Sequence, residues 1–463
     1  MKNIGKKWVI KGRIKTLSPL VVGTGDDSSD TDIIIQKDPE GNPLIPATSL
    51  AGALRHAFFE QLKIEESEKK AYRRIWGDSF QENGKEVPLK SLLYFEDMQP
   101  LKNVQDKIEL RDGIKIDPKR GIVEDKGKYD YEMLARGAEF PLHIEVVQAR
   151  NDDKKRMKTL ISSITRLLEN GKVRLGGMNT KGYGKVQLNE TRVLEYDFND
   201  KRAFLDWITK NEALENHLGE EERKALSLKE NEKNDLIIEA GLKLKTSLLI
   251  RSYSTDPNAP DASYMKSDAQ PVIPGPSLKG ALRQRGEKIM RTIAGPAKPE
   301  NAIQSLFGFV ETEDGAKKGE NKKSRFYAEE SVYELDKVVE KIQARIRIDR
   351  FTGGTIKTAL FDEMPLWPEG EEEMFKVTFS IKDCKEWEAG LALLILKDLM
   401  TGDLIIGGGK SIGRGVFEGV YATIDYDNRS YEFHQNGKID FKRGSKEELE
   451  SYVRAFNESF KGV

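Results

Sequence analysis

One block of twelve residues occurs twice in this chain. Residues 44–55 read LIPATSLAGALR, and residues 272–283 read VIPGPSLKGALR. Three more pairs of motifs follow in the same order, each pair about 230 residues apart. They are a Gly-centred tripeptide (76–78 and 307–309), an Ile-x-Ile-Asp block (114–117 and 346–349), and a double glycine closing with Gly-x-Gly (176–184 and 407–415). Four motifs in one order at one spacing indicate an internal duplication, so the chain is expected to fold as two related modules.

Length and composition agree with two hydrophobic cores. The chain has 463 residues, of which 38% are hydrophobic, and 76 basic residues balance 77 acidic ones. A net charge of −1 excludes a uniformly basic nucleic-acid-binding protein, so any anion-binding surface has to be a local patch. The single cysteine, Cys384, excludes an internal disulfide and a cysteine-cluster zinc site. No run approaches the roughly 20 apolar residues that cross a bilayer, and we expect a cytoplasmic protein without membrane contact.

The same order of elements is expected in both copies. A strand is followed by a short hairpin, and a hydroxyl residue, Ser49 or Ser277, is expected to cap an amphipathic helix. Two further strands, a second helix and the double-glycine block complete each copy. The expected strands are 8–14, 92–96 and 140–146 in the first copy and 242–250, 324–328 and 375–381 in the second, and the second helices are 157–169 and 388–400. This order predicts an α+β fold of two tandem ferredoxin-like (RRM-like) modules.

Charge patterning suggests the domain boundaries. Residues 216–236 are highly charged and short of large apolar groups, which is typical of a linker. We therefore expect a first module at 1–215, a second at 237–427, and a C-terminal tail at 428–463 packed on the second module.

The double-glycine blocks allow two interpretations. Exposed backbone N–H groups beside a cation suit a phosphate, and Lys181 and Lys410 supply the cations. Alternatively, the glycines let two strands pack closely. The recurrence of a cation with Gly-x-Gly favours nucleic acid, although neither block is a P-loop, because the Gly-Lys-Ser/Thr signature is out of place. Arg55 and Arg283, each one or two turns into the motif helix, would add a second phosphate contact.

Aspartates gather in the loop ahead of each motif helix. The first loop holds Asp26, Asp27, Asp30 and Asp32, and the second holds Asp256 and Asp261. In loops rich in Gly, Asn and Pro an aspartate is most often a turn former. Beside an RNA phosphate it could instead bind a divalent metal and promote phosphodiester cleavage. The four histidines are not at metal-ligand spacing from one another.

Taken together, these motifs resemble the RAMP superfamily of CRISPR-associated proteins. The combination of Ile-Pro-x-x-Ser-Leu-x-Gly-Ala-Leu-Arg, the Ile-x-Ile-Asp block and the closing Gly-x-Gly is most similar to backbone subunits of type III effector complexes. Such subunits are usually separate chains, so a fused pair looks most like the double-module protein of III-D-type complexes. The resemblance covers roughly residues 8–195 and 240–425.

The resemblance implies a function in guide-RNA binding. Each module would be a palm that grips guide RNA, with a β-hairpin thumb inserted between guide and target RNA. The thumbs would span 114–132, with Ile116 and Asp117, and 346–365, with Ile348 and Asp349. The residues implied to contact RNA are Ser49, Arg55, Arg174, Lys181, Tyr183, Ser277, Lys279, Arg283, Lys410 and Arg414. One continuous groove is expected to be lined by Arg55, Arg174, Lys181, Arg283, Lys410 and Arg414. Implied partners are guide RNA, complementary target RNA, and other RAMP-type and large subunits of the complex.

The resemblance also implies target-RNA cleavage by a loop aspartate, with a divalent metal such as Mg²⁺ or Mn²⁺, through attack of the 2′-hydroxyl on the adjacent phosphate. In the family this residue lies about six positions before an Asp-Pro-type turn. Asp32 stands six before Asp38 and is the first choice, with Asp26, Asp27 and Asp30 as substitutes. In the second copy Asp261 stands seven before Asp268, and Asp256 is the substitute.

Two other functions remain open from the sequence. The chain could be a non-catalytic scaffold that binds guide RNA, its loop aspartates being turn formers. It could also be an endoribonuclease that processes precursor guide RNA. Such enzymes usually depend on a histidine, and His56 is the only histidine near a motif helix.

Overall fold

The computed structural model describes most of the chain. The described residues are 4–25, 31–82, 85–102, 104–117, 122–150, 152–211, 217–231, 234–252, 258–295, 299–309, 321–333, 338–369, 375–435 and 437–460. They form two compact units. The first unit is Met1–Leu110, Asp130–Asn179 and Tyr183–Glu232, and the second is Arg111–Tyr129, Thr180–Gly182 and Lys233–Val463.

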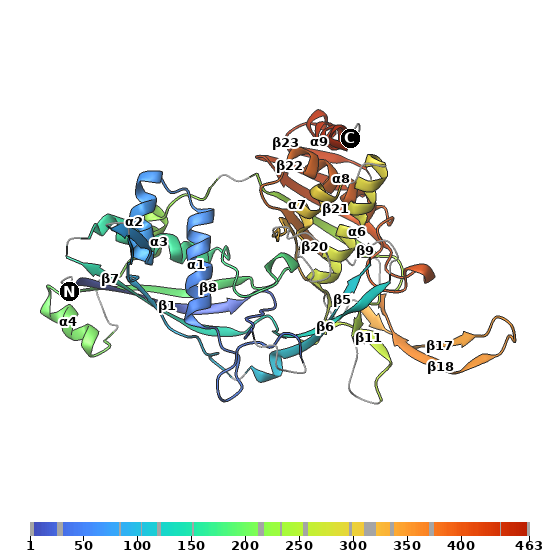
Figure 1. Ribbon diagram of the computed structural model, residues 1–463, viewed down its shortest axis with the longest axis horizontal. Coiled ribbons are helices and arrows are strands. Elements are labelled where there is room, and N and C mark those ends of the chain that lie inside the picture. The colour runs from blue at the N-terminus through green and yellow to red at the C-terminus, as the bar shows by residue number, and fades with distance from the viewer. Residues whose placement is uncertain are drawn as a thin grey trace. The chain divides into compact units, whose positions relative to one another are not determined.

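A four-stranded antiparallel sheet forms the centre of the first unit. Its strand order is β4-β7-β1-β8, with bounds β1 Ile4–Thr16, β4 Leu93–Phe95, β7 Glu139–Ala149 and β8 Val186–Asp197. Helices α1 (Ala47–Gln61) and α3 (Lys154–Glu169) pack against each other and lie on the same side of this sheet (Figure 1). Alternate side chains of β7 are buried beneath them, as the period of two in its sequence requires. Strand, helix, two strands, helix and strand in this order make a ferredoxin-like module.

Further elements complete the first unit. They are α2 (Glu66–Trp76), β2 (Ser79–Glu82), β3 (Lys85–Pro88), α4 (Lys201–Ile208) and α5 (Glu220–Leu226). Helix α5 lies within the segment expected to be a linker. Its Arg223 is buried and donates to the carboxylate of Glu169 at 2.7 Å. The described part of this segment is therefore folded onto α3, a long-range contact that charge patterning alone does not reveal.

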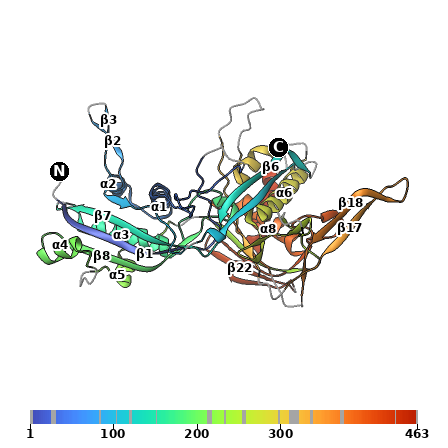
Figure 2. The ribbon, with the colours of Figure 1, turned by 90° about the horizontal axis from the view of Figure 1, so that it is seen from below.

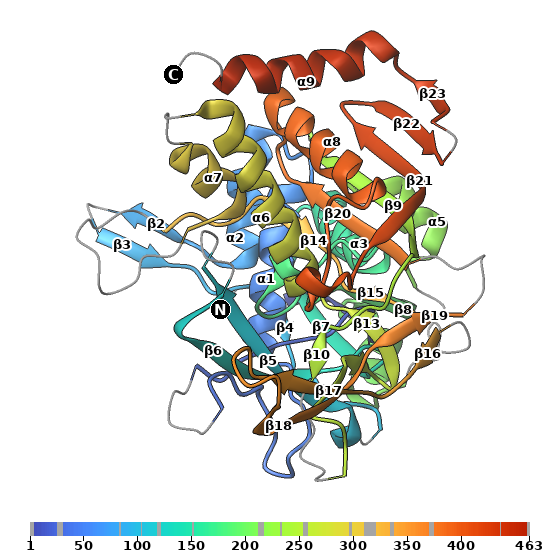
Figure 3. The same cartoon turned by 90° about the vertical axis from the view of Figure 1, so that its right-hand side faces the viewer.

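The second unit repeats this sheet and extends it. The strand order is β14-β20-β9-β21-β22-β23, with bounds β9 Leu236–Leu244, β14 Phe326–Ala328, β20 Phe375–Ile381, β21 Phe417–Tyr426, β22 Arg429–His434 and β23 Ile439–Arg443. Helices α6 (Gly275–Ala294), α7 (Glu300–Phe307), α8 (Glu386–Met400) and α9 (Lys446–Phe460) belong to the same unit, and α6, α8 and α9 lie on one side of the sheet (Figure 3).

The C-terminal residues form regular structure on this unit. From residue 428 onward they supply β22, β23 and α9, and α9 buries Tyr452 and Phe456. Helix α9 lies so close to α8 that a Cβ on Gly390 would be 2.2 Å from the carbonyl oxygen of Tyr452. Glycine at position 390 is thus required for this helix packing.

Two local expectations were wrong. The strand predicted at 242–250 lies at Leu236–Leu244 instead, because alternation of apolar residues begins before the predicted start. The motif helices are not capped by hydroxyl groups. They begin at Ala47 and Gly275, directly after a proline, so Ser49 and Ser277 lie inside the first turn. The carboxylate of Asp97 accepts the N–H of Ala47 at 2.6 Å, and this contact from a distant segment satisfies the helix end.

Each copy carries an inserted β-hairpin, as predicted. The first consists of β5 (Ile108–Ile116) and β6 (Val123–Leu134), and the second of β17 (Gln343–Ile348) and β18 (Thr355–Met364). We call these the first and second hairpins. The second extends away from the body of its unit (Figure 2), and Phe351 at its tip is 99% exposed.

Small sheets surround the second hairpin. β10 (Arg251–Ser252) and β11 (Ala262–Tyr264) join it in the order β10-β11-β18-β17. A three-stranded sheet contains β12 (Lys266–Ser267), β13 (Gln270–Ile273) and β15 (Ser331–Val332). A two-stranded sheet contains β16 (Val338–Glu340) and β19 (Leu366–Pro368).

A buried ion pair fixes the first hairpin in the second unit. Arg111 of β5 donates to Glu330 through both terminal nitrogens, at 2.5 and 3.3 Å. The two side chains are only 3% and 2% exposed. Loss of one partner would leave a buried charge unpaired, which costs about 3–5 kcal/mol in comparable cases. This pair therefore holds β5 strongly in place.

The double-glycine blocks dock on the segment that follows the central strand. In the first copy the N–H groups of Gly177 and Gly184 donate to the carbonyls of Val21 and Pro19, both at 2.7 Å. A Cβ on Gly184 would lie 2.1 Å from the carbonyl oxygen of Leu175.

The second copy repeats this docking at equivalent positions. Gly408 donates to Leu249 and Gly415 donates to Ser247, again both at 2.7 Å. These N–H groups are used within the fold, so the prediction that the block offers them to phosphate was wrong for these four glycines. Close packing is the better explanation of the motif.

We predict that Gly415→Ala destabilises the second unit much more than Gly413→Ala. Both glycines have positive φ, 76° and 81°, so both substitutions strain the backbone. Only at Gly415 would the new Cβ collide, 1.9 Å from the carbonyl oxygen of Ile406, whereas Gly413 has open space around it. Chemical unfolding followed by circular dichroism should give an extra loss of about 1–3 kcal/mol for Gly415→Ala. Equal losses would contradict the packing role.

Candidate functional site

Asp32 lies where the loop ahead of α1 meets the first hairpin. Its neighbour Ile33 forms a parallel bridge with Tyr131 of β6. The carboxylate of Asp32 accepts the backbone N–H of Asp130 at 2.8 Å, and the carboxylate of Asp130 accepts the N–H of Asp32 at 3.0 Å. Asp32 is exposed and Asp130 is half-buried. Two carboxylates thus lie side by side at the base of the hairpin, one from the loop and one from the strand.

Asp261 occupies the equivalent place in the second copy. Ala262, directly after it, forms a parallel pair with Glu363 of β18. The carboxylate of Asp261 accepts the backbone N–H of Asp362 at 2.8 Å. Asp261 therefore corresponds to Asp32, and Asp362 corresponds to Asp130. The shared contact with the hairpin strand shows that these two aspartates are equivalent. Their spacing to the next turn differs between the copies and supports the equivalence less well.

Sequence reasoning missed Asp130 and Asp362. A signal was present, because the two residues are separated by the same interval as the Ile-x-Ile-Asp blocks that begin the hairpins. The substitute candidates Asp26, Asp27, Asp30 and Asp256 lie outside the described residues. Within the described ranges, no three His, Cys, Asp or Glu side chains gather closely enough to hold a metal ion by themselves.

The residues beneath the two aspartate sites differ. In the first copy the hydroxyls of Tyr131 and Tyr183 lie 2.9 Å apart, and both side chains are buried. In the second copy the same positions hold Glu363 and Arg414, whose carboxylate and guanidinium are 2.8 Å apart. Tyr183 and Arg414 were predicted to contact RNA. Tyr183 is 0% exposed and Arg414 is 2% exposed, so these predictions were wrong, because both side chains pack beneath the hairpin strand.

A cluster of cations surrounds the start of α6. Lys279 is buried, and its ammonium donates to the hydroxyl of Ser324 at 2.9 Å. Burial lowers the pKa of Lys279 to about 7, together with smaller contributions from the nearby charges of Lys181 and Arg283. Lys181 also donates to the hydroxyl of Tyr129 on the first hairpin, at 3.2 Å. Three predicted RNA-binding residues are therefore close together, in an arrangement that an anion would stabilise.

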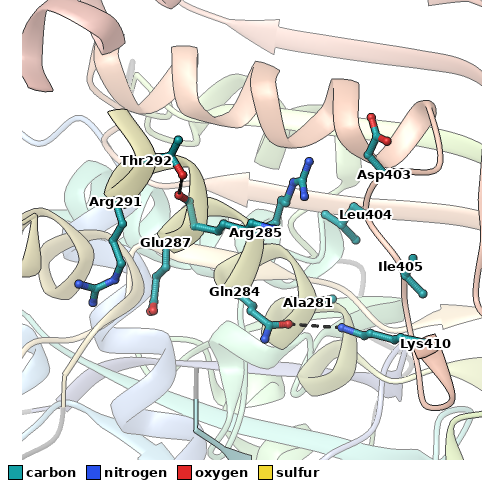
Figure 4. A pocket seen from close by; sticks show the side chains of 11 residues that line it. Ala281, Gln284, Arg285, Glu287, Arg291, Thr292, Asp403, Leu404, Ile405 and Lys410 are labelled. Atoms are coloured by element: carbon teal, nitrogen blue, oxygen red, sulfur yellow. Dashed lines mark hydrogen bonds between the residues drawn. The ribbon is translucent and has the colours of Figure 1, made fainter. Parts of the chain in front are cut away.

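A cavity of about 610 Å³ lies farther along α6. Side chains of α6 and of the loop after α8 face it in Figure 4. Lys410, predicted to bind RNA, donates to Gln284 across this cavity at 3.3 Å, and burial lowers the pKa of Lys410. Arg285 and Arg291 also line the cavity, and each is paired with a carboxylate, Arg285 with Asp398 and Arg291 with Glu300. Of the basic residues expected to line one groove, Lys410 faces this cavity, whereas Arg414 is buried and does not belong to a surface groove.

The remaining predicted residues lie near the surface. Arg55 lines a smaller cavity of the first unit with His56 and Arg73. Arg174 donates to the carbonyl of Tyr183 at 3.2 Å, which ties it to the glycine block. Ser49 and Ser277 are half-buried in the first turns of their helices.

The Ile-x-Ile-Asp blocks form the outgoing strands of the hairpins. Ile116 and Ile348 are 48% and 57% exposed, which is unusual for isoleucine and leaves apolar surface available to a partner. The N–H of Asp117 donates to the carbonyl of Ile122 at 2.9 Å. The carboxylate of Asp349 accepts the N–H groups of Thr352 and Phe351, which lowers the pKa of Asp349 and shapes the turn.

The fold is therefore a tandem of two ferredoxin-like modules, each with an inserted hairpin. The model of the RAMP superfamily matches residues 13–187 and 242–418, which together are most of the chain. The chain therefore belongs to the RAMP superfamily, with one match per module. This superfamily is associated with CRISPR complexes and RNA binding, and some of its members are ribonucleases. No curated protein matches the chain. No helix of the described residues is long and apolar enough to cross a membrane.

We predict that Lys279 makes the stability of the second unit depend on pH. Its folded pKa of about 7 is below the ordinary value of 10.5. Between these values the unfolded chain binds more protons than the folded chain, so the free energy of unfolding rises with pH across this window. Lys279→Met should raise the free energy of unfolding at pH 6, and the gain should shrink toward pH 10. The control is Lys446→Met on exposed α9. Parallel pH profiles for the wild type and Lys279→Met would contradict this role.

Proposed function

We propose that this chain is a double-module backbone subunit of a type III CRISPR ribonucleoprotein, most like the fused III-D-type subunit. The observation that carries the proposal is the repeated placement of one exposed aspartate against the base of an inserted hairpin. Asp32 and Asp261 make the same backbone contact with equivalent strand residues. Side chains kept at the same place in two copies of a fold are more readily explained by shared function than by two unrelated turns.

Guide RNA would bind through the basic clusters, and the hairpins would act as thumbs. Among the described residues, no carboxylate is paired with the Lys279 ammonium, so this cluster of cations suits a phosphate of the RNA backbone. The exposed isoleucines and Phe351 of the second hairpin offer apolar surface on which bases could stack. Implied partners are guide RNA, complementary target RNA and other subunits of the complex.

The aspartate pairs would also give each module a cleavage site for target RNA. Two carboxylates from separate segments fit part of the shell of a hard divalent cation, with RNA phosphate oxygens and water as the remaining ligands. Bound Mg²⁺ or Mn²⁺ would stabilise the negative charge that develops on the attacked phosphate. Asp32 and Asp261 would orient the target strand so that a 2′-hydroxyl faces the adjacent phosphate. Attack there expels the 5′-oxygen and leaves a cyclic phosphate and a 5′-hydroxyl.

A non-catalytic scaffold is the second candidate. The reciprocal hydrogen bonds between Asp32 and Asp130 are enough to tie the loop to the hairpin, which is a purely structural use of both carboxylates. Guide-RNA binding without cleavage would then be the whole function.

We predict that Asp32→Ala and Asp261→Ala each remove one set of cuts in a complementary target RNA. The ribonucleoprotein is assembled with each variant, with the double variant, and with Asp106→Ala, which removes an exposed carboxylate elsewhere in the first unit. Loss of a catalytic group should slow the affected cut by at least about 100-fold. If guide RNA is bound and both single variants keep every cut, the catalytic assignment of Asp32 and Asp261 is wrong. Guide-RNA binding with no cut even in the wild type would support the scaffold function.

We also predict that Lys181, Arg283 and Lys410 contribute to RNA affinity through charge. Each substitution to Ala should weaken guide-RNA binding and reduce the slope of log affinity against log salt by about 0.7. Lys446→Ala on α9 serves as the control. An unchanged salt slope in all three variants would exclude these residues from the RNA interface.

A further inference from the structure

The two aspartate sites differ by three arginines. Arg251 of β10 pairs with Tyr264 of β11, and in the first copy the equivalent bridge joins Gly23 to Ile35. Arg345 of β17 stands four residues before the Asp of its Ile-x-Ile-Asp block, where the first copy has Gly113.

The third difference is Arg414, which replaces Tyr183 between two glycines. The duplication thus provides an internal comparison. Equivalent backbone contacts occur in both copies, but only the second copy carries these three positive charges.

All three arginines contact one buried carboxylate. Glu363 is 4% exposed, and its oxygens lie 2.8 Å from Arg414, 3.0 Å from Arg251 and 3.1 Å from Arg345. One negative charge is shared by three positive charges, and one arginine would be enough to neutralise it. Burial lowers the pKa of Arg414, and the charges of Arg345 and Arg251 oppose its protonated form as well. Packing alone does not explain the two additional arginines.

The three arginines differ in how far their side chains are exposed, and this difference indicates two roles. The side chain of Arg414 is 3% exposed and serves as the buried partner of Glu363. Arg345 and Arg251 are 31% and 51% exposed, so their guanidiniums can reach a ligand in solvent while they stay bonded to Glu363. A guanidinium presents several donors in one plane, which suits phosphate oxygens.

This exposed charge lies beside Asp261. Glu363 is the strand partner of Ala262, the residue after Asp261, and Arg251 is on the strand that pairs with the same segment. Of the described residues, no carboxylate other than Glu363 lies within 4 Å of the Arg251 or Arg345 guanidinium. In the first copy Tyr131 stands at the position of Glu363, and the residue after it, Glu132, is paired with Lys37.

We propose that Arg251 and Arg345 form a phosphate-binding site that holds a phosphodiester of target RNA next to Asp261, and that the first module has no such site. This inference rests on the proposed function, and it adds that the two modules engage the target strand differently. The second module holds its phosphate through the positive charges of Arg251 and Arg345. The first relies on other contacts, because glycines stand in place of the arginines.

Mapping of cuts tests the proposal. The ribonucleoprotein is prepared with Arg251→Gln and Arg345→Gln together, and the cut that Asp261→Ala removes is assigned to the second module. The double variant should slow this cut by about tenfold or more, the loss expected when hydrogen bonds to a charged group are removed, and leave the other cut unchanged. Arg347→Gln, on the same strand without contact to Glu363, is the control. If the double variant makes each of the two cuts at the wild-type rate, the proposal is wrong.

A measurement that does not need cleavage tests the phosphate-binding site separately from the proposed cleavage function. Phenylglyoxal modifies accessible arginines, and mass spectrometry reports each site. Complementary target RNA should protect Arg251 and Arg345 at least about fivefold, while Arg454 on α9 stays reactive. If no RNA is cut but both arginines are protected, the cleavage function fails and the phosphate site stands. If the RNA is cut and neither arginine is protected, the phosphate site is wrong.

Discussion

The candidate sites depend on one backbone arrangement that occurs in both copies. The segment after the central strand lies between the glycine block on one side and the base of the hairpin on the other. Leu20 and Leu134 exchange hydrogen bonds in the first copy at 2.8 and 2.9 Å, and Leu248 and Leu366 do so in the second at 2.8 Å each. Because this segment continues into the aspartate-bearing loop, its position determines where the loop meets the hairpin.

Main-chain hydrogen bonds rather than side chains set this arrangement, so the side chains beneath it can differ. Tyr131 and Tyr183 form a buried hydroxyl pair in one copy, whereas Glu363 and Arg414 form a buried ion pair in the other. Each pair places polar groups opposite one another in a buried position, two hydroxyls in the first copy and two opposite charges in the second. The duplication could therefore keep one geometry for the aspartates while changing the charge around them, and this difference underlies the proposed phosphate site beside Asp261.

The sequence predicted the duplication and the order of elements through repeated motifs and apolar periodicity, and it predicted the two hairpins through the family resemblance of those motifs. It did not predict features that depend on distant partners. The cap of α1 comes from Asp97, fifty residues away, and not from a neighbouring hydroxyl. Tyr183 and Arg414 follow a glycine-rich pattern typical of surface loops, yet the hairpin strand covers both. Asp130 and Asp362 belong to the sites through strand pairing, and the only sequence signal for them is the interval that they share with the repeated Ile-x-Ile-Asp blocks.

The central claim is that each exposed aspartate at the base of a hairpin faces the target strand where pairing is interrupted. A structure of the chain bound to guide and target RNA tests it most directly. The account predicts one target phosphate against Asp32 and another against Asp261, in contact directly or through a single cation, with the hairpins beside them. A target strand that runs along another face, away from both aspartates, would contradict it.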